Sequence, residues 1–413
     1  AKADAKGYWE VNLKALEAGG PYQLQITGKD NQISIKDILI GDVWLCSGQS
    51  NMQWVVNNVT NAEVEKKNAN YPQIRTLNIP RRMELSPKDT ISATWLVCSP
   101  ENVGRFSGVA YFFAKKVYEE TNIPIGIINS SWGGTIVETW TSLEAANTLP
   151  QKRLDRYNKN EKLFPPTEYL TRKNKEAKRN DYPSLVYNAM IHPLLSFSIK
   201  GVLWYQGENN VGNAEPYTDW LTCMIGDWRN RWNSELPFYI IQLPNFDSIN
   251  KKPLWAEMRD AQSKVLAVPG THLIVTSDLG DPYDLHPRNK QEVGMRAALQ
   301  ALHYEYGYSD IVSESPMFER MEINGDKVII TFKNTGSGLE IRSRYGCLQG
   351  FAIAGEDKKF HWALGELKDN RIVIWSPKVP NPVAVRYNWE NNPDGNLYNK
   401  DGLPACLFRT DNW

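Results

Sequence analysis

The chain contains regions with two different patterns of hydrophobic and polar positions. Between residue 41 and about residue 308, short runs that are apolar throughout alternate with longer segments in which apolar side chains recur every three or four residues. Runs of the first kind are typical of buried strands and segments of the second kind of helices. We expect strands at 43–46, 125–128, 201–205, 238–241 and 272–275, and helices at 106–121, 185–195, 217–232, 255–266 and 291–303. Repeated helix-to-strand units predict an α/β fold with a doubly wound parallel sheet.

Both ends of the chain show the alternation typical of β structure instead. Segments 22–27 and 32–35 alternate on either side of a polar turn at 28–31. Two strands bury no face alone, so we expect this part to pack on another β domain or on a missing N-terminal partner. Later apolar runs, separated by turn residues, predict a sandwich-like β region. They lie at 327–332, 371–375 and 384–387.

These patterns predict three parts, with boundaries at residues 1–40, 41–308 and 309–413. The first is a β segment, the second the α/β domain and the third the C-terminal β region, and 413 residues are enough for two or three domains. Residues 152–180 are rich in charge and contain two consecutive prolines. We interpret them as an insertion on the surface of the α/β domain.

Charge and cysteine content exclude several classes of function. The 47 basic residues balance the 47 acidic ones, which disfavours a nucleic-acid groove or a polybasic membrane surface. No apolar run approaches the roughly 20 residues of a membrane span. The chain begins at Ala1 without a signal-peptide pattern, which suggests a processed form or an expression fragment. Five cysteines without a C-x-x-C spacing favour buried thiols over a zinc site or a disulfide, for which Cys347 and Cys406 are the pair to test.

Ser50 is a candidate nucleophile. It lies in the pentapeptide Gly48–Met52, directly after the predicted strand 43–46. The carboxyl ends of parallel strands are where α/β folds place ligands and reactive groups. Serines are also common in ordinary turns, so the pentapeptide alone supports the two interpretations equally.

Two other strand ends carry groups suited to an oxyanion. Gly133 and Gly134 follow the strand 125–128 and allow backbone N–H groups to approach a ligand, although an isolated glycine pair is more often a plain turn. After the next strand, Gln206 or Asn209 offers a side-chain amide, which donates hydrogen bonds without titrating.

Glu208 lies between the two amides in sequence. It either orients a neighbour, binds a sugar hydroxyl, or is a solvated loop carboxylate.

His286 is the best candidate for a general base among five histidines. It lies after the strand 272–275 in a loop rich in aspartate, and Asn289 with Glu292 resembles a capping box behind it. A serine hydroxyl needs a base within hydrogen-bond reach, and imidazole suits that task near neutral pH. For the other histidines we expect structural roles. They are His192, His272, His303 and His361.

All these segments follow strands of one predicted sheet, so we expect them to meet at one edge. In combination they resemble the sialate O-acetylesterase family of SGNH-type hydrolases. The motifs that carry the resemblance are Gly48–Met52, Ser131–Thr135, Trp204–Glu208, Asp284–Pro287 and the C-terminal segments 396–399, 402–405 and 408–411. The resemblance implies a flavodoxin-like esterase core with β domains and hydrolysis of acetyl esters on sugars, above all O-acetylated sialic acid. It also implies no metal or other cofactor, and export to the periplasm or the cell exterior.

By position, the resemblance implies that Ser50 is the nucleophile and that His286 is the general base and then the acid for the leaving alcohol. The implied oxyanion hole takes the backbone N–H of Ser50, that of Gly133 or Gly134, and an amide from Gln206 or Asn209. The substrate-contacting residues that we expect are Gln49, Trp132 and Glu208.

One departure concerns the residue that orients the base. The superfamily places an aspartate three residues before the histidine, where this chain has Tyr283. Asp284 lies two residues before His286 and Asp281 five before. Either a carboxylate, with Asp284 the first choice, orients the imidazole, or a backbone carbonyl does so and the site is a Ser-His dyad.

The substrate is the least determined part. O-acetylated sialic acid competes with acetyl xylan and other acetylated glycans, and a sialate carboxylate needs a cationic clamp such as Arg75, Arg105 or Arg288. An inactive carbohydrate-binding protein is the alternative of another class, which 15 tryptophans would suit. The presence of both Ser50 and His286 favours the enzyme. The sequence predicts no oligomeric state.

Overall fold

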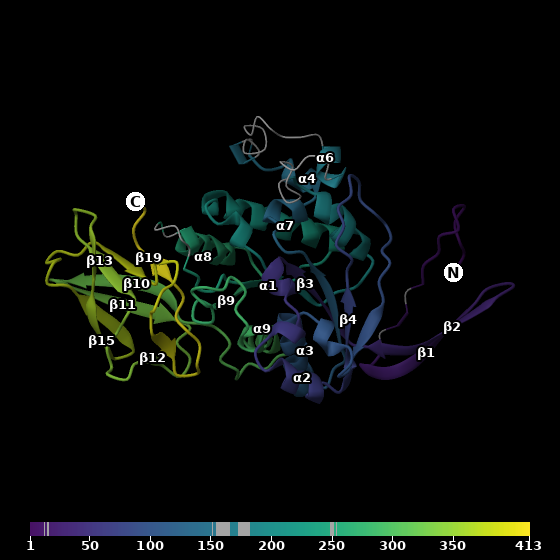
Figure 1. Cartoon of the computed structure of the whole chain (residues 1–413), viewed down its shortest axis with the longest axis horizontal. Helices are drawn as coiled ribbons and strands as arrows, with labels where there is room; N and C mark the ends of the chain where they lie inside the picture. The colour runs from purple at the N-terminus through teal and green to yellow at the C-terminus, as the bar shows by residue number, and fades with distance from the viewer. Residues whose placement is uncertain are drawn as a thin grey trace.

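The computed structural model describes residues 1–11, 13–14, 16–150, 152–153, 166–171, 182–247, 252 and 254–413. An α/β core lies between an N-terminal β-hairpin and a C-terminal β region, which extend from opposite sides of the core (Figure 1). The insertion predicted at 152–180 falls mostly outside the described residues. Within it the structure describes the short helix α6, Pro166–Thr171.

The core is built on a seven-stranded sheet with the order β5-β4-β6-β3-β7-β8-β9. The strands are β3 (Asp42–Gly48), β4 (Tyr71–Asn78), β5 (Trp95–Cys98), β6 (Ile125–Ser131), β7 (Gly201–Tyr205), β8 (Phe238–Ile241) and β9 (Thr271–Ile274). Every neighbouring pair is parallel except β4 and β5, which are antiparallel. The mixed α/β fold with a mainly parallel sheet is therefore confirmed, while the edge strand β5 and its neighbour β4 were not predicted.

Helices cover both faces of this sheet, which explains why its strands read as apolar throughout. On one face α3 (Gly108–Thr121) and α9 (Lys290–Glu305) pack on inward side chains such as Trp44 and Leu203. On the other face α7 (Ala214–Trp232) and α8 (Leu254–Lys264) pack on the alternate side chains, among them Leu45 and Trp204. Period-two alternation thus supplies two hydrophobic layers from the same strands.

One predicted helix differs in kind from the expectation. Residues 185–195 contain a π-helical turn, Tyr187–Ile191, followed by a 3₁₀ turn, His192–Leu194. Pro193 lies at the start of the second turn and lacks the N–H that a continuous α-helix needs, so the regular ladder cannot run through it.

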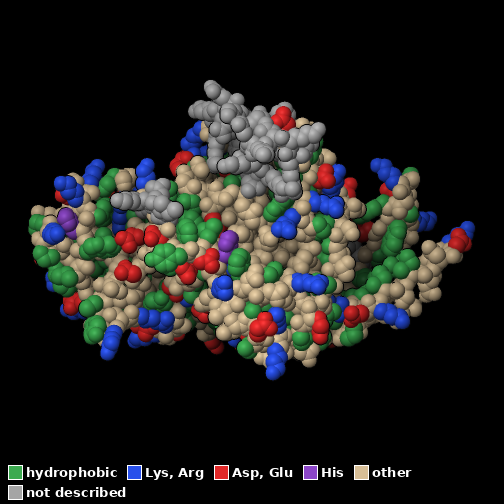
Figure 2. Space-filling view, viewed as in Figure 1, with side chains coloured by type: hydrophobic (Ala, Val, Ile, Leu, Met, Phe, Trp, Pro, Cys, Tyr) green, Lys and Arg blue, Asp and Glu red, His purple; other side chains and the backbone are tan. Residues whose placement is uncertain are grey.

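The N-terminal hairpin consists of β1 (Gly19–Thr27) and β2 (Gln32–Ile40), as predicted. It extends from the core, and several of its apolar side chains, including Tyr22, Ile33 and Ile35, are exposed. Figure 2 shows hydrophobic side chains along the arm and, elsewhere on this face, basic and acidic side chains interspersed.

The C-terminal region is rich in β structure, as expected. One sheet has the order β10-β11-β16-β15 and a second the order β14-β13-β17-β19, with β12 and β18 forming a further pair. The strands are β10 (Met317–Asn324), β11 (Lys327–Lys333), β12 (Leu339–Ile341), β13 (Phe351–Ala354), β14 (Phe360–Trp362), β15 (Leu364–Lys368), β16 (Arg371–Trp375), β17 (Ala384–Tyr387), β18 (Leu397–Asn399) and β19 (Phe408–Arg409). Side chains of both sheets, such as Ile330 and Ile353, share one apolar core.

The five cysteines all lie within the described residues and are free. Cys347 is exposed while Cys406 is buried and accepts a hydrogen bond from Gln242, so this pair forms no disulfide. Within the described ranges, no helix has the length and apolarity that crossing a bilayer requires.

Candidate active site

Three strand ends meet at the centre of the carboxyl edge of the sheet. Gly48 of β3 lies level with Ser131 of β6 and Tyr205 of β7. A Cβ at Gly48 would lie 2.1 Å from the Tyr205 carbonyl oxygen, and Gly48 has a φ of +129°, so this close approach requires glycine. The chain then turns into the short helix α1 (Ser50–Gln53), which follows β3 near the middle of the molecule (Figure 1). Ser50 is thereby placed at the predicted edge.

The backbone of Gly133 lies directly against Ser50. A Cβ added at Gly133 would lie 3.2 Å from the Cβ of Ser50. The Gly133 N–H donates a hydrogen bond to Oε1 of Gln53, at 2.8 Å. The glycine predicted as an oxyanion donor is therefore beside the candidate nucleophile, with its N–H held by a side chain that the sequence analysis did not single out. The signal for Gln53 was its position one helical turn after Ser50.

The loop of His286 contacts the chain directly after Ser50 at two points. The imidazole stacks on Trp54, with 4.8 Å between ring centroids and 8° between planes, and the backbone N–H of Trp54 donates to the Ser50 carbonyl oxygen at 2.9 Å. Nδ2 of Asn51 also donates to the Leu285 carbonyl oxygen at 3.1 Å. The structure thus brings together the helix of the candidate nucleophile and the loop of the candidate base.

The imidazole of His286 is in an environment that favours its neutral form. Burial lowers its pKa below the ordinary value, and the positive charge of Lys290 lowers the pKa further, while the carboxylate of Asp284 acts in the opposite direction. Among the described residues, the buried Nε2 of this ring has no hydrogen-bond partner. A neutral ring with a free nitrogen can accept a proton.

Asp284 contacts the backbone of His286. Its Oδ1 accepts a hydrogen bond from the His286 N–H at 2.8 Å, and Asp281 pairs with Asp284 in an isolated β-bridge. Tyr283, which occupies the position of the superfamily aspartate, is 89% exposed. This geometry gives Asp284 a role in shaping the loop that presents the imidazole.

Gln206 and Gln49 require a correction, because both side chains turn into the interior. Nε2 of Gln206 donates to Gln49 Oε1, the Thr135 carbonyl and Asn210 Oδ1. Gln49 is 2% exposed, and its Oε1 also lies near the N–H groups of residues 207 and 209. An amide after a strand can point to the edge or to the core, and here these two point to the core. Gln206 is therefore not free to act as an oxyanion donor, nor Gln49 to contact substrate.

The carboxylate of Glu208 is part of a polar cluster behind Ser50. Its Oε1 accepts from Nδ2 of Asn51 at 2.5 Å, and Nζ of Lys290 donates to Asn51 Oδ1 at 2.5 Å. Burial raises the pKa of Glu208 and lowers that of Lys290 to about 7. The sequence analysis missed Asn51 and Lys290, although the first lies in the nucleophile pentapeptide. The second follows the predicted cap, in which Asn289 Oδ1 accepts from the Glu292 N–H.

Asn209 and Trp132 stay at the edge of the sheet. The exposed side chain of Asn209 donates to the Gly134 carbonyl at 2.5 Å, and Trp132 is half-buried with its N–H bonded to the Gly48 carbonyl. Of the three arginines considered for a sialate carboxylate, Arg75 is bound to Asp37 of the hairpin, away from the carboxyl edge. Arg105 and Arg288 are exposed.

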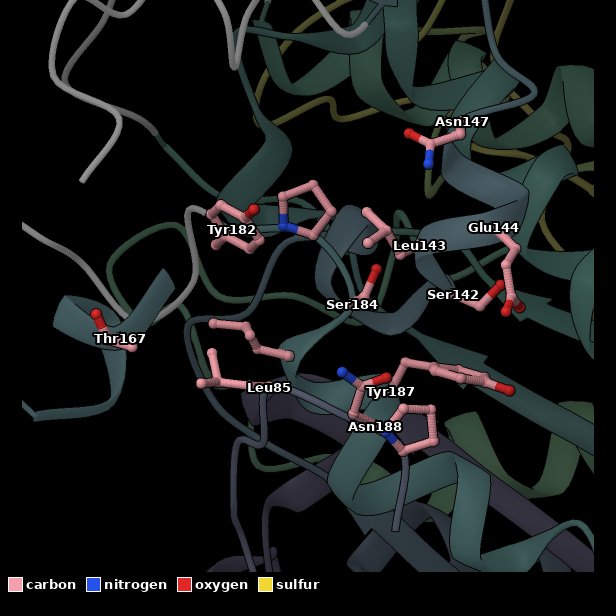
Figure 3. Close-up of a pocket in the computed structure, with 13 residues that line it drawn as sticks. Leu85, Ser142, Leu143, Glu144, Asn147, Thr167, Tyr182, Ser184, Tyr187 and Asn188 are labelled. Atoms are coloured by element: carbon pink, nitrogen blue, oxygen red, sulfur yellow. The ribbon is translucent and has the colours of Figure 1, made fainter. Parts of the chain in front are cut away.

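A separate cavity of about 530 Å³ lies elsewhere in the core. Figure 3 shows Tyr182, Leu143 and Leu85 around it, from the segment at 182–188, the short helix α4 (Leu143–Ala146) and the chain after β4. Its described lining includes none of the candidate catalytic residues. The described residues also hold no group of three or more His, Cys, Asp or Glu side chains placed to bind a metal ion.

The fold and the site together define an α/β protein with a serine and a histidine at the carboxyl edge of its central sheet. The chain belongs to the family described as carbohydrate esterase, sialic acid-specific acetylesterase, whose sequence model matches residues 40–303. The predicted family is therefore confirmed.

Individual relatives agree with this assignment. Rat sialate O-acetylesterase is 31% identical over 76% of this chain and 66% of its own length, and the human protein 32% identical over 78% and 65%. The chain thus spans about two thirds of the length of these relatives. The crystal structure of a carbohydrate acetylesterase from Xanthomonas citri is 40% identical, with a TM-score of 0.90 over 100% of this chain and 90% of that one.

Proposed function

We propose that this chain is a carbohydrate esterase that hydrolyses O-acetyl esters on sugars, with Ser50 as nucleophile and His286 as general base. The observation that carries the proposal is the double attachment of the His286 loop to the helix of Ser50, through Trp54 and through Asn51. Membership of the acetylesterase family supports the same reaction. We take the catalytic domain to be an SGNH-type, flavodoxin-like core at residues 41–308. The hairpin at 1–40 and a sandwich-like domain at 309–413 flank it.

In this mechanism the Ser50 hydroxyl attacks the acetyl carbonyl carbon and its proton passes to the imidazole of His286. The negative oxygen of the tetrahedral intermediate accepts hydrogen bonds from the backbone N–H of Ser50 and that of Gly133 or Gly134. Asn209 is the remaining candidate for a side-chain donor. Collapse breaks the ester C–O bond, and His286 protonates the leaving sugar hydroxyl.

Water then attacks the acetyl-serine, again with His286 as base, and releases acetate. As written, the two steps need no metal or organic cofactor. Where the donor is Gly133, its N–H exchanges the bond with Gln53 for the oxyanion, and we then expect the Gln53 side chain to move during each cycle. Asp284 orients the loop through the His286 backbone, which makes the reacting pair a serine and a histidine.

We propose O-acetylated sialic acid as the substrate, because curated relatives of this chain are sialate O-acetylesterases. A neutral acetylated glycan such as acetyl xylan is the second candidate. It is favoured by the engagement of Arg75 with Asp37, which removes one cation from the set considered for a carboxylate clamp. Either substrate would be met in the periplasm or outside the cell.

Acetate release from matched acetylated sugars tests this proposal. We expect release from O-acetylated sialic acid, and a preference for acetyl xylan would replace the first substrate by the second. With p-nitrophenyl acetate, Ser50→Ala should lose at least about 10³-fold in kcat. Ser47→Ala, which removes a buried hydroxyl from β3, the strand before Ser50, is the matched control and should stay active. Equal rates for wild type and Ser50→Ala would remove Ser50 from the mechanism and leave a binding protein.

A further inference from the structure

We propose that Lys290 is a positioning residue of this site, which acts through Asn51 on the placement of nucleophile and base and through its charge on His286. The inference rests on the proposed function for the roles of Ser50 and His286. Lys290 lies in the first turn of α9, three positions after the end of the segment that resembles the family motif. The inference rests on the contacts of Lys290 and not on that motif.

The side-chain amide of Asn51 is the centre of the arrangement. Its Nδ2 donates to Glu208 Oε1 at 2.5 Å and to the Leu285 carbonyl at 3.1 Å, while its Oδ1 accepts from Nζ of Lys290 at 2.5 Å. Asn51 adjoins Ser50 in sequence, and Leu285 adjoins His286. One fully buried amide therefore sets the distance between the two reacting residues, and Lys290 fixes the orientation of that amide.

The burial of Lys290 at this position is energetically unfavourable. Its side chain is fully buried, and burying an ammonium group costs free energy unless it is closely compensated. Among the described residues no carboxylate lies within ion-pair distance of its Nζ. The acidic group of Glu208 lies on the far side of the Asn51 amide. An apolar side chain would fill the same space at lower cost, so simple packing does not account for a lysine.

Several structural elements pack on Lys290 and place titratable or aromatic groups near its ammonium. Glu208 follows β7, Asp284 and His286 lie on the loop before α9, and the ring of Tyr205 lies 5.6 Å from the ammonium. From α3, the uncharged Gly108 lies against its aliphatic stem. Among the described residues, the group of the proposed reaction whose pKa the charge of Lys290 shifts is the imidazole of His286.

The positive charge of Lys290 affects the protonation of His286. A positive Lys290 opposes a second positive charge on the imidazole and lowers the pKa of His286. Burial lowers the pKa of Lys290 itself to about 7, so its charge is present in the acidic range in which the imidazole takes up a proton. Lys290 thereby extends toward lower pH the range in which His286 is a competent base, and the two groups titrate as a coupled pair.

The test is the titration of His286 in Lys290→Met, a variant of similar length without charge. The chain has five histidines, so the ring signals can be followed by NMR and that of residue 286 assigned by its loss in His286→Asn. We expect the pKa of His286 to rise by roughly half a unit or more. In p-nitrophenyl acetate hydrolysis, the acid side of the kcat/KM profile should move to higher pH by the same amount. We expect kcat to fall about tenfold with KM changed less than about twofold.

Two further variants keep the test decisive. Glu208→Gln removes the acid that favours a charged Lys290, so it should raise the pKa of His286 in the same direction by a smaller amount. The control Lys115→Met removes a half-buried lysine of α3 that is paired with Glu65, and it should leave the pKa of His286 unchanged.

An unchanged His286 titration in folded Lys290→Met overturns the proposal. If that variant does not fold, an unchanged titration in Glu208→Gln does so. The NMR measurement needs no turnover, so an inactive wild type would refute the proposed function without deciding this inference.

Discussion

The two residues that flank Ser50 enter buried polar clusters of different character. Gln49 joins an amide cluster, in which Gln206 bonds to Asn210, Tyr217 and Gln262. Asn51 joins a charged cluster formed with Glu208 and Lys290. Each cluster links the chain that follows β3 to the chain that follows β7.

The difference lies in how completely each cluster is satisfied. Gln206 uses its amide protons, its side-chain oxygen and its backbone carbonyl in hydrogen bonds. In the charged cluster, the buried Oε2 of Glu208 has no partner among the described residues. A closed network of neutral groups fixes a geometry, whereas an incompletely compensated charge responds to pH. We infer that the amide cluster on the Gln49 side of Ser50 fixes the geometry of the site. The charged cluster on the Asn51 side makes the site respond to pH.

The largest expected effect is on the pH dependence of stability in Lys290→Met. Burial lowers the pKa of Lys290 from 10.5 to about 7, so between these values the unfolded chain holds a proton that the folded chain does not. The free energy of unfolding of the wild type therefore rises with pH across this window, by at most about 1.4 kcal/mol per pH unit from this group. The variant should lack that rise.

Urea denaturation at pH 7, 8 and 9 measures the difference between wild type and variant. Curves that stay parallel over these three values would show that Lys290 has an ordinary pKa. The charged cluster would then be as insensitive to pH as the amide cluster, and the comparison would fail.

Gln206→Leu should lower the free energy of unfolding by about 3 kcal/mol. The substitution removes the side-chain hydrogen bonds that Gln206 makes to Gln49, Asn210 and Tyr217, and each lost hydrogen bond contributes about 0.5–1.5 kcal/mol. The loss should be the same at pH 7, 8 and 9, in contrast to Lys290→Met. Tyr217→Phe, which removes a single hydroxyl, is the control and should cost about 1 kcal/mol. A loss from Gln206→Leu that varies with pH would contradict the neutral character of this cluster.

The sequence predicted the parts of the fold that rest on periodicity. Runs such as 238–241 are apolar throughout because both faces of β8 are covered, and its predicted and observed bounds coincide. β4 and β5 were missed because several of their side chains are only half-buried, and polar residues such as Gln73 and Arg75 interrupt the apolar run of β4. The helix expected at 185–195 was altered by Pro193, whose effect depends on whether the turn can continue as a 3₁₀ turn.

For the candidate site, the sequence predicted which residues reach the edge but not where each side chain points. Ser50, Gly133 and the His286 loop meet as expected, because strand ends in a parallel sheet converge. Gln206 and Glu208 follow the same strand end but turn inward, toward partners more than 150 positions earlier in the chain. Such partners cannot be found from local spacing, which is also why Lys290 was missed.

Gln53→Glu places a charge on the side of Ser50 that lies beside Gly133, and we expect kcat/KM to fall about tenfold above the pKa of the new carboxyl. The carboxylate would hold the Gly133 N–H more strongly and repel the developing oxyanion, which reduces the stabilisation that one donor supplies. The pH profile with p-nitrophenyl acetate measures the effect. Gln53→Met is the control, since it frees the N–H and should keep kcat/KM at or above the wild-type value. An unaffected Gln53→Glu enzyme would exclude the Gly133 N–H from the oxyanion hole.

Asp284→Asn should have the smallest effect on rate, because the amide oxygen can keep the hydrogen bond to the His286 N–H. We expect kcat within about threefold of wild type, whereas an aspartate that holds the tautomer of a catalytic histidine costs about 10⁴-fold when changed to asparagine. The carboxylate of Asp284 raises the pKa of His286, so its removal should move the acid side of the kcat/KM profile to lower pH. That shift is opposite in sign to the one expected for Lys290→Met, and in the double variant the two should largely cancel. A loss near 10⁴-fold in Asp284→Asn would instead show that the carboxylate of Asp284 orients the imidazole of His286. The loop of His286 would then determine the properties of this base, and the charged cluster behind Ser50 would contribute only marginally.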